Sequence, residues 1–289
     1  MTKKFSFVLV CFFCLIITGC GQNKDHVVTI KTRYGDMVAI LYDETPKHKE
    51  NFLKLAKEKY FDSLIFHRVI KGFMIQGGDP DSRNAKPGAN VGTGGPKYTI
   101  DAEFNPKFFH EKGALSAARL PDAQNPTKAS SGSQFYIVQG TVLPEAELKI
   151  DPVKLNTAMQ QFFQNPVNRP AYDSVLAYYR NQDMKGYQGY VLKLKPRIEK
   201  ETGIIPEKEI APEKLKAYTT LGGAPHLDGE YTVFGKIIKG LEVIDSIAAQ
   251  PVGQGDRPME DIHMTVVVEQ MPKRKIEKEF GFKYPDEKK

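Results

Sequence analysis

Cysteine is scarce in this 289-residue chain, and its three cysteines all lie near the start, at Cys11, Cys14 and Cys20. No cysteine follows Cys20, so the body of the protein can form no internal disulfide and no cysteine-based metal site. The six histidines are scattered and show no His-Glu-x-x-His spacing, so a catalytic zinc is not expected. The sequence predicts neither a metal nor a cofactor.

Other chemistry-bearing patterns are missing as well. Tryptophan is absent, so phenylalanine and tyrosine must supply the aromatic packing. Gly92, Gly94 and Gly95 are not followed by the Gly-Lys-Ser/Thr of a phosphate loop. No serine lies in a nucleophile elbow. Nucleotide hydrolysis and serine-hydrolase chemistry are therefore not indicated.

The charge pattern argues against a nucleic-acid partner. The formal net charge is +6, but Lys3 and Lys4 belong to a leader that we expect to be removed. The remaining lysine-rich stretches also carry glutamate, which is typical of a solvated surface and not of a groove that follows phosphates.

The N-terminus has the pattern of an export signal. A short basic region precedes an almost unbroken apolar run from Phe5 to Ile17, which is too short for the about 20 residues of a membrane span. The run closes on Ile17-Thr18-Gly19-Cys20, which resembles a bacterial lipoprotein signal. We therefore expect residues 1–19 to be a lipoprotein signal peptide and residues 20–26 a tether.

That resemblance implies acylation of Cys20 and attachment to a bilayer in the cell envelope, facing the periplasm or the cell surface. Two or more acyl chains hold a protein to a membrane stably, whereas one chain binds reversibly. The alternative is an ordinary signal peptide or short anchor with an incidental cysteine at this position.

The body reads as mainly β. Apolar and alternating runs predict strands, and helical periodicity after Thr45-Pro46 and around Val243 to Ala248 predicts two helices. The expected strands are residues 27–33, 37–42, two short ones within 64–76, 114–118, 134–139, 231–238 and 262–270. Many strands with two helices indicate a β barrel or sandwich.

Residues 143–221 differ from the rest. Asp151-Pro152, Arg169-Pro170 and Ala211-Pro212 each have the form of a helix start, and apolar residues after them recur at helical spacing. We expect a helical insertion within the β domain. Residues 272–289 are highly charged and are expected to be a surface tail.

Four blocks resemble the cyclophilins in sequence and in order. They are FHRVIKGFMIQGGD at residues 66–79, LSAAR at 115–119, SQFYI at 133–137 and HLDGEYTVFG at 226–235. The resemblance implies a closed eight-stranded antiparallel barrel capped by two helices, here built from residues 27–142 and 222–271. It also implies peptidyl-prolyl cis/trans isomerase activity.

The resemblance also implies roles for single residues. Arg68 matches the catalytic arginine, and Gln76 matches an amide that positions it. The residues expected to bind substrate are Phe73, Met74, Ala118, Arg119, Gln134, Tyr136, His226 and Leu227. Arg119 stands where many members have asparagine, and His226 where many have tryptophan. These departures concern substrate preference more than the reaction.

The reaction needs no nucleophile, metal or covalent step. Rotation about a peptide bond is opposed by a barrier of about 18–20 kcal/mol from amide resonance, and a catalyst must favour the twisted form. Arg68 suits this task because its guanidinium is always charged and presents donors in a rigid fork. Taken without the motif, Arg68 is better explained as a structural ion-pair arginine, and Phe73 and Met74 as plain core; the motif reverses this preference.

Two functions stay open. One is a monomeric folding enzyme that isomerises X-Pro bonds in exported, proline-containing polypeptides. The other is a module that binds proline-bearing segments or acts as a chaperone through the helical insertion, with turnover secondary. Arg68 favours the enzyme, and the insertion favours an added binding role. Both ends of the insertion are expected near the active-site rim, since it leaves soon after Tyr136 and returns just before Leu227.

Overall fold

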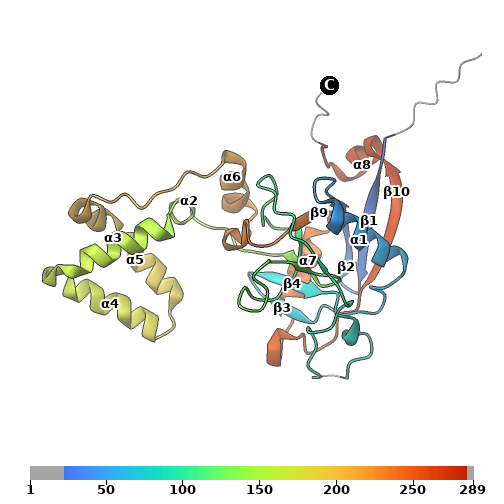
Figure 1. Ribbon diagram of the computed structural model, residues 1–289, viewed down its shortest axis with the longest axis horizontal. Coiled ribbons are helices and arrows are strands. Elements are labelled where there is room, and N and C mark those ends of the chain that lie inside the picture. Colours follow the sequence, from blue (N-terminus) through green and yellow to red (C-terminus); the bar gives the residue numbers. More distant parts are fainter. Residues whose placement is uncertain (1–22, 87, 285–289) are drawn as a thin grey trace, which may run out of the picture.

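The computed structural model of the chain describes residues 23–86 and 88–284, which form a β-sheet body and a projecting set of helices (Figure 1). Cys20, the expected lipidation site, and residues 1–19 lie outside the described residues. No helix in the described ranges is both long and apolar enough to cross a membrane.

The body is built on one eight-stranded sheet in which all neighbouring strands are antiparallel. Its order is β10-β1-β2-β9-β6-β8-β4-β3. The strands are β1 (Lys24–Thr32), β2 (Gly35–Leu41), β3 (Arg68–Ile70), β4 (Met74–Gly77), β6 (Ala114–Ala117), β8 (Phe135–Val138), β9 (Val233–Lys239) and β10 (Thr265–Pro272). Two short strands, β5 (Thr99–Ile100) and β7 (Ser130–Ser131), pair separately. The mainly antiparallel β architecture is thus confirmed.

The two end strands of this sheet, β10 and β3, are not paired with each other in the described part of the chain. The segments before them are joined by backbone hydrogen bonds. Phe66 N donates to Ile262 O at 3.0 Å, and Met264 N donates to Leu64 O at 2.8 Å. The closed barrel stays a prediction.

Two helices flank the sheet, as expected. Helix α1 (Pro46–Lys57) begins with proline at its first position, although the Thr45 hydroxyl donates to Tyr42 O at 3.3 Å and caps no helical N–H. Helix α7 (Leu241–Ala248) buries Val243, Ile244, Ile247 and Ala248, the face that the sequence predicts.

The core under α1 is aromatic. Phe52 on α1 lies 4.8 Å from Phe61, 5.4 Å from Phe135 and 5.6 Å from Phe234, measured between ring centroids. Stacked and edge-on pairs of this kind add to the free energy of burial. Phenylalanine thus supplies the aromatic packing of this core, as expected for a chain without tryptophan.

The region between Leu143 and Leu221 is helical. Its helices are α2 (Glu145–Leu148), α3 (Pro152–Gln164), α4 (Arg169–Arg180), α5 (Met184–Thr202) and α6 (Pro212–Thr220). Helices α3, α4 and α5, called the arm below, bury a core of their own around Phe162, Val175, Val191 and Ile198. A separate core lets the arm hold its shape away from the sheet.

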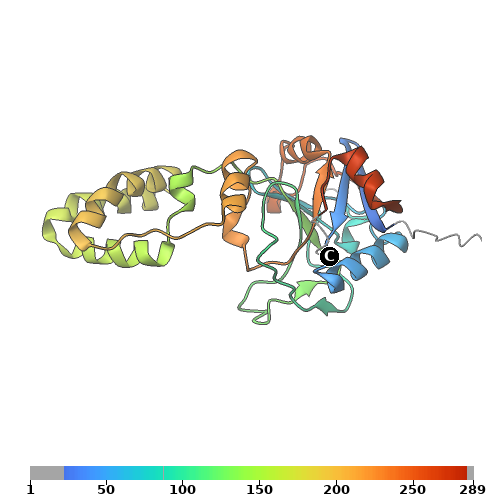
Figure 2. The same ribbon diagram turned by 90° about the horizontal axis from the view of Figure 1, so that it is seen from above.

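The arm is joined to the body by two adjacent backbone segments. Ile150 pairs with Glu207, Asp151 N donates to Pro206 O at 3.0 Å, and Lys208 N donates to Lys149 O at 2.8 Å. Figures 1 and 2 both show the arm at one end of the long axis, with β1 and β10 at the other.

The ends of the body differ from the expectations. Strand β1 begins at Lys24, so residues 24–26 are part of the sheet and not of a tether. The expected tail contains helix α8 (Lys273–Phe280), whose Ile276 is fully buried against Val27, Val38 and Ile40. Phe280, Phe282 and Tyr284 pack against the same cluster, so the C-terminal segment covers this outer face of the sheet.

Candidate active site

Arg68 and Gln76 face each other across the hairpin of β3 and β4. They form a register pair, and Arg68 Nη1 lies 3.5 Å from Gln76 Oε1. Gln76 Nε2 donates to Gln134 Oε1 at 3.0 Å, and Gln134 Nε2 donates to Gly92 O at 3.0 Å and Gly94 O at 2.8 Å. A chain of amides therefore runs from the exposed guanidinium to the loop before β5.

A carboxylate that the sequence analysis missed lies on the other side of Arg68. Asp256 Oδ2 is 3.5 Å from Arg68 Nε, and Asp256 has a φ of +59°, a left-handed conformation that aspartate tolerates better than most residues. Buried Arg257 fixes this turn, because its guanidinium pairs with Asp261 and donates to Ala89 O at 2.7 Å. The segment Gly255-Asp256 was a signal for such a turn, but nothing in the sequence placed it beside Arg68.

Five of the residues expected to bind substrate come together in one apolar cluster. Met74, Ala118, Tyr136 and Leu227 are buried in it, and Phe73 packs against it. The His226 ring, on an exposed residue, lies 5.4 Å from the Phe73 ring. The structure thus brings the predicted apolar residues to the face of β4 and β8 that neighbours Arg68.

Ala118 and Arg119 are held by internal bonds. Ala118 N donates to Gln134 O at 3.0 Å, and Ala118 O accepts from Ser131 N at 2.8 Å. The Arg119 side chain, only 4% exposed, donates to Glu230 O at 2.9 Å, and its guanidinium carbon lies 4.4 Å from the centre of the Tyr231 ring. The side chain of Arg119 is therefore occupied by contacts within the protein. Only its backbone is left to contact a substrate.

His67, next to Arg68 in the sequence, is buried. Neither ring nitrogen has a hydrogen-bond partner among the described residues. Burial lowers the pKa of His67 to about 4, against the opposing attraction of Asp79. A neutral, enclosed imidazole at pH 7 is no proton donor for the reaction.

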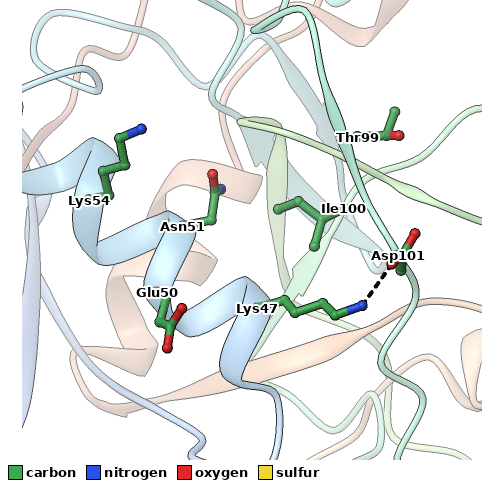
Figure 3. A pocket seen from close by; sticks show the side chains of 7 residues that line it. All are labelled: Lys47, Glu50, Asn51, Lys54, Thr99, Ile100 and Asp101. Atoms are coloured by element: carbon green, nitrogen blue, oxygen red, sulfur yellow. Dashed lines mark hydrogen bonds and ion pairs between the residues drawn. The ribbon is translucent and has the colours of Figure 1, made fainter.

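A hollow in the surface lies away from these residues. It has a volume of about 420 Å³ and lies between α1 and β5, where Lys47 pairs with Asp101 at 2.7 Å (Figure 3). None of the residues that line it is among the predicted site residues. Within the described ranges, no group of three or more His, Cys, Asp or Glu side chains could hold a metal ion.

Comparison with known proteins identifies the family. The family described as "Cyclophilin type peptidyl-prolyl cis-trans isomerase/CLD" matches residues 27–151 and 213–269. A Staphylococcus haemolyticus protein provisionally named a peptidyl-prolyl cis-trans isomerase is 31% identical over 245 residues, which cover 83% of this chain and 89% of that protein.

Two further matches differ in extent. A Streptococcus pyogenes protein, provisionally named a bifunctional phosphatase/peptidyl-prolyl cis-trans isomerase, is 32% identical over 241 residues, 81% of this chain but only 37% of that longer protein. The crystal structure of a Cryptosporidium parvum cyclophilin-type isomerase aligns with a TM-score of 0.48 at 22% identity, covering 85% of this chain and 98% of the other.

Proposed function

Because the chain belongs to the cyclophilin-type family of peptidyl-prolyl cis-trans isomerases, we propose that Arg68 is the group that lowers the barrier to rotation of an X-Pro bond. In the twisted amide the proline nitrogen loses resonance and can accept a hydrogen bond. Arg68 donates this bond from a fork that Gln76 approaches at one side and Asp256 at the other.

The apolar cluster supplies the rest of the site. Met74, Tyr136 and Leu227, with Phe73 beside them, form an apolar surface against which a proline ring can pack. A ring that fills this surface excludes water from the guanidinium, which strengthens its hydrogen bond to the twisted amide. The substrate class is proline-containing polypeptide.

The observation that carries this proposal is the position of Arg68 between Gln76 and Asp256, beside the apolar cluster. Arg68→Ala is expected to lower kcat/KM for a short X-Pro peptide by about 10²-fold or more, on the scale of one lost transition-state donor. Arg68→Lys should recover only part of the loss, because an ammonium lacks the planar fork. A protease-coupled isomerisation assay measures both.

The matched control is stability. Arg68 is partly exposed and its ion pair is long, so neither variant should shift the urea midpoint by much. Near-wild-type turnover in a folded Arg68→Ala protein would overturn the mechanism.

A second function is favoured by the arm. Its surface exposes apolar side chains at its ends, among them Val153 (74% exposed), Val167 (77%) and Tyr179 (65%). We propose that the arm holds unfolded segments of client proteins while the sheet body isomerises their prolines.

Location and closure complete the proposal. Acylation of Cys20 after export would hold the protein, as a monomer, to the cell-envelope membrane, so its clients would be exported proteins. The hydrogen bonds that join residues 63–66 to residues 262–264 support closure of the eight-stranded sheet into a barrel.

A further inference from the structure

A buried chain of hydrogen bonds joins helix α6 to the wall of the proline pocket. Tyr218 on α6 donates its hydroxyl to Asp228, at 2.9 Å from Oδ1 and 2.8 Å from Oδ2. Asp228 Oδ1 is 3.0 Å from His110 Nδ1, and His110 Nε2 is 2.9 Å from the Tyr136 hydroxyl. The chain ends on a residue of the apolar cluster beside Arg68.

Three of its four members are buried, and the side chain of the fourth, Asp228, is 18% exposed. The exposed fractions are 0% for His110, 2% for Tyr218 and 4% for Tyr136. Removing one partner from a buried hydrogen bond leaves the other unsatisfied, which costs more than the bond itself contributes. Each link therefore constrains the next.

The charge of Asp228 decides which group donates in each of these hydrogen bonds. Burial raises the pKa of Asp228, but hydrogen bonds from His110 and Tyr218 outweigh it and leave the pKa below its ordinary value. An ionised carboxylate only accepts, so His110 Nδ1 donates to it. With a proton on Nδ1, the His110 ring accepts the Tyr136 hydroxyl proton at Nε2, 2.9 Å away, and burial raises the pKa of Tyr136, which keeps that proton in place.

Backbone packing fixes the far end of the chain. A Cβ at Gly223 would lie 2.5 Å from the Tyr218 ring, so only glycine leaves room for the ring at this position. Leu143 N donates to Tyr218 O at 3.1 Å, which ties α6 to the segment that leaves β8. Helix α6 is thus held to the body at the point where the chain returns from the arm.

We infer that Tyr218, Asp228 and His110 are positioning residues that fix the Tyr136 wall of the proline pocket. Helix α6 then belongs to the support of the active site, although it falls within the insertion that the sequence predicts; the family match resumes at residue 213, one residue into α6. The inference rests on the proposed function. A phenylalanine in place of Tyr136 would pack on the same surface without this restraint, so the hydroxyl is what links the pocket to α6.

The test is a double-mutant cycle on the full chain. Tyr218→Phe and Tyr136→Phe each remove one hydroxyl and keep the ring. We expect Tyr218→Phe to lower kcat/KM for a short X-Pro peptide by about fivefold, within the range of coupling between residues in one network. In the Tyr136→Phe background, the same change should have almost no further effect, because the chain is already broken. Tyr172→Phe on α4, away from the network, should leave the rate unchanged.

Two outcomes would overturn the inference. Unchanged kcat/KM in Tyr218→Phe would make the chain a matter of stability alone, which urea unfolding reports separately. An equal loss in both backgrounds would show that the effect does not pass through Tyr136. Asp228→Asn, which replaces the central acceptor, provides a second variant if Tyr218→Phe folds poorly. Failure of the proposed function gives a different result, because the Arg68→Ala protein would then remain active.

Discussion

At Arg68, the proposed catalytic arginine, the β3–β4 hairpin meets a turn that is distant in the sequence. Gln76 comes from the adjacent strand, whereas Asp256 comes from a turn near the C-terminus. An ion pair of 3.5 Å between side chains that are 42% and 45% exposed contributes little to the free energy of folding. The pair instead restricts the orientation of the guanidinium, because Gln76 and Asp256 hold it from two sides before the substrate binds.

The buried histidine beside Arg68 makes stability depend on pH. His67 has a pKa of about 4 in the folded chain and an ordinary value of 6.5. Between these values the unfolded chain binds a proton that the folded chain does not, so stability falls as pH drops from 6.5 towards 4. At about 1.4 kcal/mol per pKa unit, the loss attributable to His67 is about 3 kcal/mol.

The measurement compares urea unfolding at pH 7 and pH 4 in the wild type and in His67→Phe. Phenylalanine keeps a ring and forfeits no hydrogen bond, because both nitrogens of His67 lack partners within the described residues. The variant should lose less stability on acidification than the wild type by about 3 kcal/mol. Equal losses in the two proteins would place the acid sensitivity elsewhere.

The arm can be deleted within narrower bounds than the insertion of residues 143–221 that the sequence predicts. Asp151 N donates to Pro206 O, so the two ends of residues 152–205 already lie side by side. A two-residue Asn-Gly turn suits such an antiparallel pair and can replace the whole arm. Helix α6 and its link to Tyr136 stay in place.

We expect the armless protein to keep its turnover of a short X-Pro peptide and to lose capture and refolding of a whole unfolded protein. Val167→Ser should weaken capture as well, whereas Val142→Ser, a valine 57% exposed outside the arm, serves as the matched control. Equal refolding with and without the arm would leave it without a binding role. Loss of the short-peptide activity would mean that the arm supports the pocket.

The sequence predicts those helices and strands whose pattern lies within a few neighbouring residues. Alternation predicts β1 and β2, and proline after a helix-capping position predicts α3, α4 and α6, because both signals lie within a few residues. Helix α8 has only Ile276 and Phe280 to bury among charged residues, so no apolar face is evident. Strands β5 and β7 have two residues each, too few for any periodicity.

The same distinction holds for the site. The motif residues Arg68, Phe73, Met74 and Gln76 are close in sequence and were predicted together. Asp256 and the pair of His110 with Asp228 depend on contacts between distant segments, which single-sequence patterns do not contain. Arg119 is expected from the resemblance, yet the direction of its side chain is fixed by Glu230 and Tyr231, which lie in the turn before β9.

Considered as a whole, the molecule is elongated, with its two ends differing in role. The arm lies at one end of the long axis, and β1, β10 and α8 lie at the other (Figures 1 and 2). Asn23, the first described residue, accepts a backbone hydrogen bond from Lys273, so the chain enters the fold beside α8. A chain held at this end would carry its arm away from the surface that holds it.

The last prediction concerns that attachment. Cys20 stands three residues before Asn23, so an acylated Cys20 could lie at most about 11 Å from the body, given a rise of about 3.6 Å per extended residue. Cys20→Ser should release the protein from the membrane fraction or stop its processing, because the proposed acyl chains would supply the anchor. Cys14→Ser, within the apolar run of the same leader, is the matched control and should leave the protein attached. Mass spectrometry of the mature N-terminus reports the acyl chains directly. An unacylated mature protein that begins at another residue would show that export ends in release, and the arm would then act on clients without a fixed distance from the membrane.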